Sequence, residues 1–205
     1  IASGSGAVAT MLLGSGTIFR EVIAAAELLK KDWGVESDIW GCPSFTELAR
    51  DGNAVSRWNL LNPAGKAKVS HVESCLKDTQ GPIIVATDYM RLFAEQIRSF
   101  VPRRYVVLGT DGFGRSDTRE KLRDFFEVDR RWVTVAALNA LADEGQIERS
   151  KVAEAMKKYA IDAKNDTHAC TQMLTPGLLL RSRQGSRLLQ SLPWRREVNL
   201  RRKNR

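Results

Sequence analysis

"YVVLGTDGFGRSDTREKLRDFF", residues 105–126, places an apolar run, a glycine-rich loop and a helical pattern in direct succession. The apolar run is typical of a strand, and the residues after Thr118 follow a helical period. Strand, loop and helix in this order form one unit of a parallel α/β sheet. The loop itself has two interpretations, a phosphate-binding cradle or a structural turn between the strand and the helix.

The same alternation of strand and helix recurs upstream of this unit. "MLLGSGT" predicts a short strand and a turn, and the helical period that follows it begins at the N-cap Thr17 and ends at Gly34. A second short strand is predicted around 38–40. The helix after it has Ser44 as its N-cap, with Glu47 three residues later to complete a capping box.

The clearest strand is "IIVATD", residues 83–88, a continuous apolar run of the kind that is buried on both faces. An amphipathic helix is predicted after it, ending before Pro102. A further helix is predicted over 129–144, with a strand at 132–135 as the alternative, and a last helix has Ser150 as its cap. The sequence therefore predicts a three-layer α/β fold, with a mainly parallel sheet flanked by helices.

Charge and composition divide the chain into segments. The 205 residues carry a net charge of +8, with 32 Lys and Arg against 24 Asp and Glu. Of these, 9 basic and 2 acidic residues lie in 166–205, which leaves 23 and 22 in 1–165, so the basicity belongs to the tail. No nucleic-acid partner is expected for the body. We predict a flexible leader at 1–10, an α/β domain at 11–165, and a poorly structured or amphipathic basic tail.

Cysteine, histidine and hydropathy patterns bound the function classes further. Cys42, Cys75 and Cys170 are predicted to be reduced thiols of a cytoplasmic protein. His71 and His168 are not expected to pair with a cysteine or a carboxylate in a metal site. No apolar stretch approaches the roughly 20 residues that a membrane helix requires, so no membrane partner is expected.

Polar residues at the ends of predicted strands are the candidates for a ligand or interface site, because ligands of open α/β sheets collect at the carboxyl ends of strands. The candidate residues are Asp88, Thr110, Asp111, Gly112, Gly114, Arg115 and Asp117. The competing interpretation is that Asp88 and Asp117 (or Thr118) cap the helices that follow them. Arg115 would then pair with Asp111 or Asp117 across the turn.

Two cofactor motifs are present only in incomplete form. The loop "GFGRSD" has the first two glycines of the dinucleotide fingerprint but Asp117 in place of the third, and the earlier "GSG" has Phe19 there. A thiamin-type pattern, Gly-Asp-Gly followed by Asn, is approached by "TDG" and Asn139. Thr110 replaces its first glycine, however, and Asn139 lies inside a helical pattern. No catalytic, cofactor-binding or metal-binding residue is therefore assigned.

Several long strings, taken in order, resemble one family. They include "LLGSGTIFREVIAAAELLKKDWGVESDIW", "ATDYMRLFAEQIRSFVP" and "VLGTDGFGRSDTREKLRDFFEVD". The family is the carboxyl-terminal, transketolase-like domain of the homodimeric bacterial pyruvate dehydrogenase, the acetyl-transferring first component of its complex. The resemblance runs from about Met11 to about Asn165 and does not include the leader or the tail.

The resemblance implies an accessory domain that packs a homodimer and supports catalytic domains located elsewhere in the enzyme. It implies a parent oxidoreductase that uses thiamine diphosphate and Mg²⁺ to decarboxylate pyruvate, with dihydrolipoyl acetyltransferase as a partner. No position here matches a catalytic residue of the family, so this chain alone is expected to be inactive and to bind no cofactor. The residues by themselves leave open a free-standing anion-binding module, or an interaction protein that acts through its basic tail.

Overall fold

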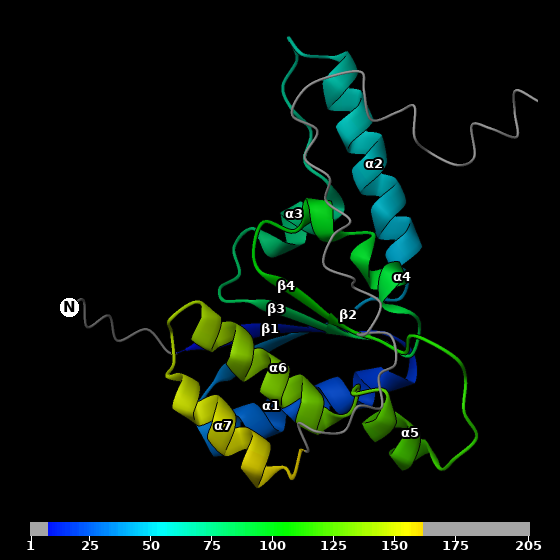
Figure 1. Cartoon of the computed structure of the whole chain (residues 1–205). Coiled ribbons are helices and arrows are strands. Elements are labelled where there is room, and N and C mark those ends of the chain that lie inside the picture. Colours follow the sequence, from blue (N-terminus) through cyan, green and yellow to red (C-terminus); the bar gives the residue numbers. More distant parts are fainter. Residues whose placement is uncertain (1–7, 162–205) are drawn as a thin grey trace, which may run out of the picture. The chain divides into compact units, whose positions relative to one another are not determined.

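The computed structural model describes residues 8–161, and a four-stranded sheet lies at their centre. All neighbouring strands are parallel, in the order β2-β1-β3-β4 (Figure 1). The strands are β1 (Ala9–Gly14), β2 (Glu36–Gly41), β3 (Ile83–Ala86) and β4 (Tyr105–Leu108). In register, Leu12 on β1 is flanked by Ile39 on β2 and Ile84 on β3.

Helices cover both faces of this sheet, which confirms the predicted three-layer α/β fold (Figure 1). One face carries α1 (Phe19–Trp33) and α6 (Arg130–Asp143), with α7 (Arg149–Lys158) packed against α6. The other face carries α2 (Phe45–Leu61), α3 (His71–Leu76) and α4 (Arg91–Glu95). Three short elements complete the order, namely η1 (Gly16–Ile18), η2 (Arg98–Phe100) and α5 (Arg119–Phe125).

Two apolar cores, one on each side of the sheet, follow from the alternation of side chains along the central strands. On β1, Leu12 belongs to the core with α1 and α6, whereas Met11 and Leu13 belong to the core with α2, α3 and α4. On β3, Ile84 and Ile83 divide in the same way. The central strands are therefore buried on both faces, as their continuous apolar sequence predicts.

Local capping signals predicted two helix ends correctly. Gly34 adopts a left-handed conformation with φ +66° and ends α1, its N–H donating to the carbonyl oxygen of Lys30 at 3.2 Å. Asp129 is the N-cap of α6, because its carboxylate accepts hydrogen bonds from the backbone N–H groups of Arg131 and Trp132. The alternative of a strand at 132–135 is therefore wrong.

The helix predicted before Pro102 is divided, and the predicted cap of the last helix is wrong. The Tyr105 hydroxyl donates a buried hydrogen bond of 2.8 Å to the carbonyl oxygen of Ala94, an oxygen that a continuous α-helix would use for its own ladder. The segment therefore forms α4 and then the separate turn η2. The last helix, α7, has Glu148 rather than Ser150 as its N-cap, and the Ser150 hydroxyl donates to the Glu148 carboxylate at 3.0 Å.

Two further boundaries differ from the prediction. Strand β1 begins at Ala9, inside the predicted leader, because the Thr10 hydroxyl donates to the carbonyl oxygen of Pro82 at 3.0 Å and the strand already pairs there. Ser44 caps α2 as predicted, but the Glu47 carboxylate pairs with Arg50 instead of closing the capping box. The rest of the predicted leader and the tail at 166–205 lie outside the described residues.

Candidate functional site

The strand order of the sheet reverses between the parallel neighbours β1 and β3, because β1 is followed in the chain by β2 on one side and β3 lies on its other side. β1 leads into α1 on one face, and β3 leads into α4 on the other (Figure 1). In open α/β sheets a reversal of this kind creates a crevice at the carboxyl ends of the two strands, and ligands bind there. The loops at 14–17 and 87–90 border this position, so the chemistry of these loops decides what the crevice can hold.

The carboxylate of Asp88 lies at this crevice and is held by the loop after β1. Its Oδ2 accepts hydrogen bonds from the backbone N–H and the hydroxyl of Thr17, each at 3.2 Å. Gly16 has φ +58°, and a Cβ at this position would lie 2.3 Å from Asp88 Oδ1, so glycine is required for the close approach. The Ser15 hydroxyl donates to Thr87 Oγ1 at 2.7 Å beside it. An internal carboxylate thus occupies the position where a dinucleotide-binding sheet holds a phosphate.

Asp88 does not cap the helix that follows it, contrary to the capping interpretation. The first N–H group of α4, that of Arg91, donates instead to Asp111 Oδ1 at 2.9 Å. The Arg91 guanidinium also forms an ion pair with the other oxygen of Asp111 at 3.0 Å. The Thr110 hydroxyl donates to the carbonyl oxygen of Asp88 at 2.8 Å, which ties the loop after β4 to the loop after β3.

The predicted ion pair of Arg115 across the turn is wrong. Its guanidinium lies 4.1 Å from the centroid of the Phe125 ring, a cation–π geometry. Asp117 instead accepts a hydrogen bond from the N–H of Thr118 and pairs with Lys121 at 3.8 Å. Of the two predicted caps for α5, Thr118 is the one in place, since its hydroxyl accepts from the N–H of Lys121.

Six of the seven candidate residues line one cleft of about 590 Å³ at the carboxyl edge of the sheet. They are Asp88, Thr110, Gly112, Gly114, Arg115 and Asp117. The seventh, Asp111, is held by Arg91 and is not part of the lining. The structure therefore brings together residues from two loops, and a ligand role for them stays a prediction.

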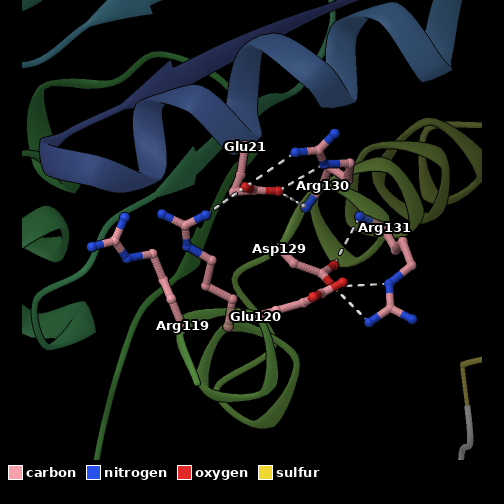
Figure 2. Close-up of a pocket in the computed structure, with 7 residues that line it drawn as sticks. Glu21, Arg119, Glu120, Asp129, Arg130 and Arg131 are labelled. Atoms are coloured by element: carbon pink, nitrogen blue, oxygen red, sulfur yellow. Dashed lines mark hydrogen bonds and ion pairs between the residues drawn. The ribbon is translucent and has the colours of Figure 1, made fainter. Parts of the chain in front are cut away.

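A second pocket, of about 610 Å³, shares Arg119 and Arg123 with this cleft (Figure 2). Its centre is Glu21 on α1, which is buried although it is charged. The Glu21 carboxylate accepts hydrogen bonds from Arg123 Nη1 at 2.7 Å and from Arg130 Nε at 2.9 Å. Burial raises the pKa of Glu21, but the hydrogen bonds and charge of Arg130, together with the charge of Arg123, outweigh it, so the pKa is lowered from its ordinary value.

The other charges of this pocket are also largely neutralised by near neighbours. Arg131 Nε donates to Asp129 Oδ2 at 2.8 Å (Figure 2). Arg131 Nη2 also pairs with Asp124, at 2.6 Å. Within residues 8–161, Arg119 is the arginine of the lining that forms no ion pair. The ion pairs around this pocket thus hold α5 and α6 against α1. They leave little positive charge on the arginines for an anion from solution.

The incomplete thiamin pattern does not form a metal site. Asp111 is engaged with Arg91, while Asn139 lies on α6 and its side chain donates to Asp143 at 3.5 Å. Across the part of the chain that the structure describes, no three His, Cys, Asp or Glu side chains are grouped to hold a metal ion. Asp111 and Asn139 therefore do not fit the magnesium ion of thiamine diphosphate. In the same residues, no helix combines the length and apolarity needed to span a membrane.

Sequence reasoning missed three residues that shape this edge of the sheet: Thr17, Arg91 and Glu21. Thr17 was expected to cap α1, although its hydroxyl reaches Asp88 on another strand end. A polar residue after the glycine-rich turn of a central strand is a usable signal for such a contact. Glu21 gave no local signal, since its partner Arg130 lies 109 positions along the chain.

The fold and its crevice define an open, parallel α/β domain with an aspartate side chain at the position where ligands of such sheets bind. Within this class, the chain belongs to the family of transketolase-like TK C-terminal domains, whose model matches residues 1–129. The predicted family resemblance is confirmed. No catalytic activity of the chain follows from family membership alone.

Curated relatives of this chain carry one common name, "Pyruvate dehydrogenase E1 component". The protein of Cupriavidus necator is 74% identical over 158 residues, covering 77% of this chain and 18% of the relative. Those of Pseudomonas aeruginosa and Escherichia coli K12 are 64% and 54% identical, each covering 74% of this chain and 17% of the relative. The chain thus spans less than a fifth of the length of these relatives.

One solved structure with a similar fold is a split-gene transketolase described as an inactive beta4 tetramer. It aligns with a TM-score of 0.46 at 17% identity, over 67% of this chain and 40% of that chain.

Proposed function

We propose that this chain is the accessory, dimer-forming domain of a thiamine diphosphate-dependent pyruvate dehydrogenase. The observation that carries the proposal is the 74% identity to a pyruvate dehydrogenase E1 component over 158 residues. The parent enzyme is an oxidoreductase that decarboxylates pyruvate and transfers the acetyl group to lipoyl groups. Its thiamine diphosphate, Mg²⁺ and catalytic residues belong to the remaining length of the polypeptide, and residues 166–205 lie outside the accessory domain.

The chemistry of the sheet edge supports an accessory role. Asp88 is satisfied by Thr17, Asp111 by Arg91, and the buried Glu21 by two arginines. Each of these carboxylates already has a partner within the chain, so a role as general base or metal ligand would compete with these contacts. The domain then contributes shape and packing, while the reaction takes place in its neighbours.

An exposed apolar surface at the same edge supports docking of the catalytic domains of the parent enzyme. Tyr89 and Leu92, at the start of α4, are 62% and 68% exposed, and Phe113 in the loop before α5 is 97% exposed. Apolar side chains left in water at a ligand-binding edge indicate a covering partner. The occupant is the catalytic part of the same enzyme, which makes up most of the relatives' length. The other proposed partners are a second copy of the chain and dihydrolipoyl acetyltransferase. The proposed location is the cytoplasm.

The first experiment separates the domain from its parent. The chain is assayed for thiamine diphosphate binding by calorimetry and for carbon dioxide release from pyruvate, beside the full-length enzyme. We expect neither binding nor turnover for the chain alone, and both for the parent. Binding or turnover by the chain alone would overturn the accessory assignment, and an inactive parent would overturn the proposed reaction.

A second experiment locates the docking surface. Leu92→Ser and Phe113→Ser are made in the full-length enzyme, and Leu60→Ser on α2, which is 78% exposed, is the matched control. Sedimentation velocity should show a weakened dimer, and pyruvate turnover should fall, for the first two variants and not for the control. An equal effect of Leu60→Ser would place the docking surface elsewhere.

A further inference from the structure

A cavity of about 430 Å³ lies on the α2–α3 face of the sheet, separate from the cleft at the carboxyl edge. Most of its wall is apolar, with Leu13, Trp40, Leu48, Val72, Leu76 and Ile97 among the lining residues. Three side chains with reactive chemistry also line it, namely Cys42, His71 and Cys75. An apolar cavity with a few convergent polar groups is the usual form of a small-molecule site.

Cys75 and His71 form a pair on one face of α3. Cys75 Sγ lies 3.5 Å from His71 Nε2, across the one-turn spacing of four residues that brings helical side chains together. The absence of a cysteine at metal-ligand spacing from His71 was wrongly inferred, because Cys75 follows it by four residues, whereas the expectation of no metal site is not contradicted. An imidazole at this distance is placed to accept the thiol proton when the sulfur attacks an electrophile.

Cys42 is the second thiol on the same cavity and differs sharply from Cys75. It is buried, whereas Cys75 is partly exposed. Burial, with a smaller contribution from the charge of Cys75, raises the pKa of Cys42 to about 11. Cys42 therefore remains a protonated, unreactive thiol at neutral pH and serves as an internal comparison for its neighbour.

We propose that Cys75 is a covalent modification site for apolar electrophiles of the α,β-unsaturated carbonyl class. His71 Nε2 accepts the thiol proton, and the thiolate sulfur forms a bond with the β-carbon of the electrophile. The π electrons move toward the carbonyl, and the resulting enolate takes the proton from the imidazolium at its α-carbon. Nothing leaves and no oxidant is required. The apolar wall binds the hydrocarbon part of the electrophile and raises its local concentration at the sulfur.

The test uses two maleimides, N-ethylmaleimide and N-phenylmaleimide, on the full chain with Cys170→Ser, so that Cys42 and Cys75 are the remaining thiols. Adducts are assigned by peptide mass spectrometry, and glutathione provides the rate of a free thiol. We expect Cys75 to react about tenfold faster than glutathione at pH 7, because a positioned base and an apolar wall that holds the reagent both favour the reaction. Cys42 should stay unmodified. Cys75 should prefer N-phenylmaleimide over N-ethylmaleimide more strongly than glutathione does.

His71→Gln is the decisive variant, and Cys75→Ser is the blank. His71→Gln should bring the Cys75 rate close to that of glutathione, with an unchanged near-ultraviolet circular dichroism spectrum. The ratio of the Cys75 rates with the phenyl and the ethyl reagent gives a second readout that needs no variant at His71, and this ratio should exceed that of glutathione. A Cys75 rate and reagent ratio equal to those of glutathione, or no change of the rate on His71→Gln in the folded protein, would overturn the proposal.

Discussion

Glu21→Gln should lower the free energy of unfolding by about 3 kcal/mol. Removing one partner of a buried ion pair typically costs about 3–5 kcal/mol, because the remaining charge is left without compensation. Glu21 has a side chain only 6% exposed, and its partner Arg123 is 17% exposed. Arg130 is 50% exposed, so water solvates its guanidinium after the change, which places the expected cost at the lower end of the range.

Urea unfolding at pH 7, followed by circular dichroism, measures this loss as a shift of the midpoint at constant m-value. The matched control is Glu36→Gln, which removes the ion pair of Glu36 with Lys30 at 3.2 Å, between side chains that are 55% and 69% exposed. An exposed pair of this kind contributes less than about 1 kcal/mol. A cost for Glu21→Gln no larger than that of the control would refute the view that this carboxylate holds α5 and α6 to α1.

The pH dependence provides an independent check of the same carboxylate. The pKa of Glu21 in the folded chain lies below its ordinary value of 4.5, because the two arginines outweigh the effect of burial. A lowered folded pKa means that the stabilisation is fully present above about pH 4.5 and is lost as the pH falls through the folded value. The stability difference between the parent chain and Glu21→Gln should therefore be constant from pH 7 to pH 5 and shrink below pH 4.5.

Three further predictions concern other parts of the domain. Asp88→Ala, which removes two hydrogen bonds of 3.2 Å, should cost about 1–3 kcal/mol, and inorganic phosphate should raise the melting temperature of this variant but not of the parent chain. Gly81→Ala should prevent stable folding, because its φ is +76° and the new Cβ would lie 1.9 Å from the carbonyl oxygen of Ala9. Gly145→Ala is the control, since φ is +72° there but the space is open, and it should lower the free energy of unfolding by about 1 kcal/mol in thermal melts. Burial, and the hydrogen bond to Asp32, raise the pKa of Tyr159 from its ordinary value of 10.0 to about 12 despite the opposing bond from Trp33. The stability that this residue contributes should therefore be fully present below about pH 10 and be lost as the pH rises from there through 12. Absorbance titration should show a late phase that Tyr159→Phe removes.

The parts of the fold that could be predicted from the sequence are those with local causes. A continuous apolar run identified the buried strand β3, and the residues Gly34 and Asp129 identified helix ends through conformations and hydrogen bonds within a few positions. The clustering of candidate residues at one sheet edge was also predictable, because parallel strands bring their carboxyl ends together. Periodicity and capping chemistry act over one or two turns, and a single sequence displays them directly.

The parts that could not be predicted depend on contacts between distant positions. Asp88 had an ordinary local explanation as a helix cap, yet its partner Thr17 is 71 positions away. The break after α4 likewise depends on the hydroxyl of Tyr105, which comes from the next strand. In both cases a favourable local choice was replaced by a tertiary hydrogen bond of similar strength, and no property of the local sequence distinguishes the two outcomes.

The carboxylate of Asp88 also acts as a competitor that is attached to the chain. A tethered group has an effective concentration of at least millimolar order at its site, and it never diffuses away. A dissolved phosphate or carboxylate must first displace it from Thr17 and then face its negative charge at short range. The strand ends therefore keep one geometry while the concentrations of small anions around the protein rise and fall. Neighbouring protein surfaces meet a template whose shape is independent of metabolite levels.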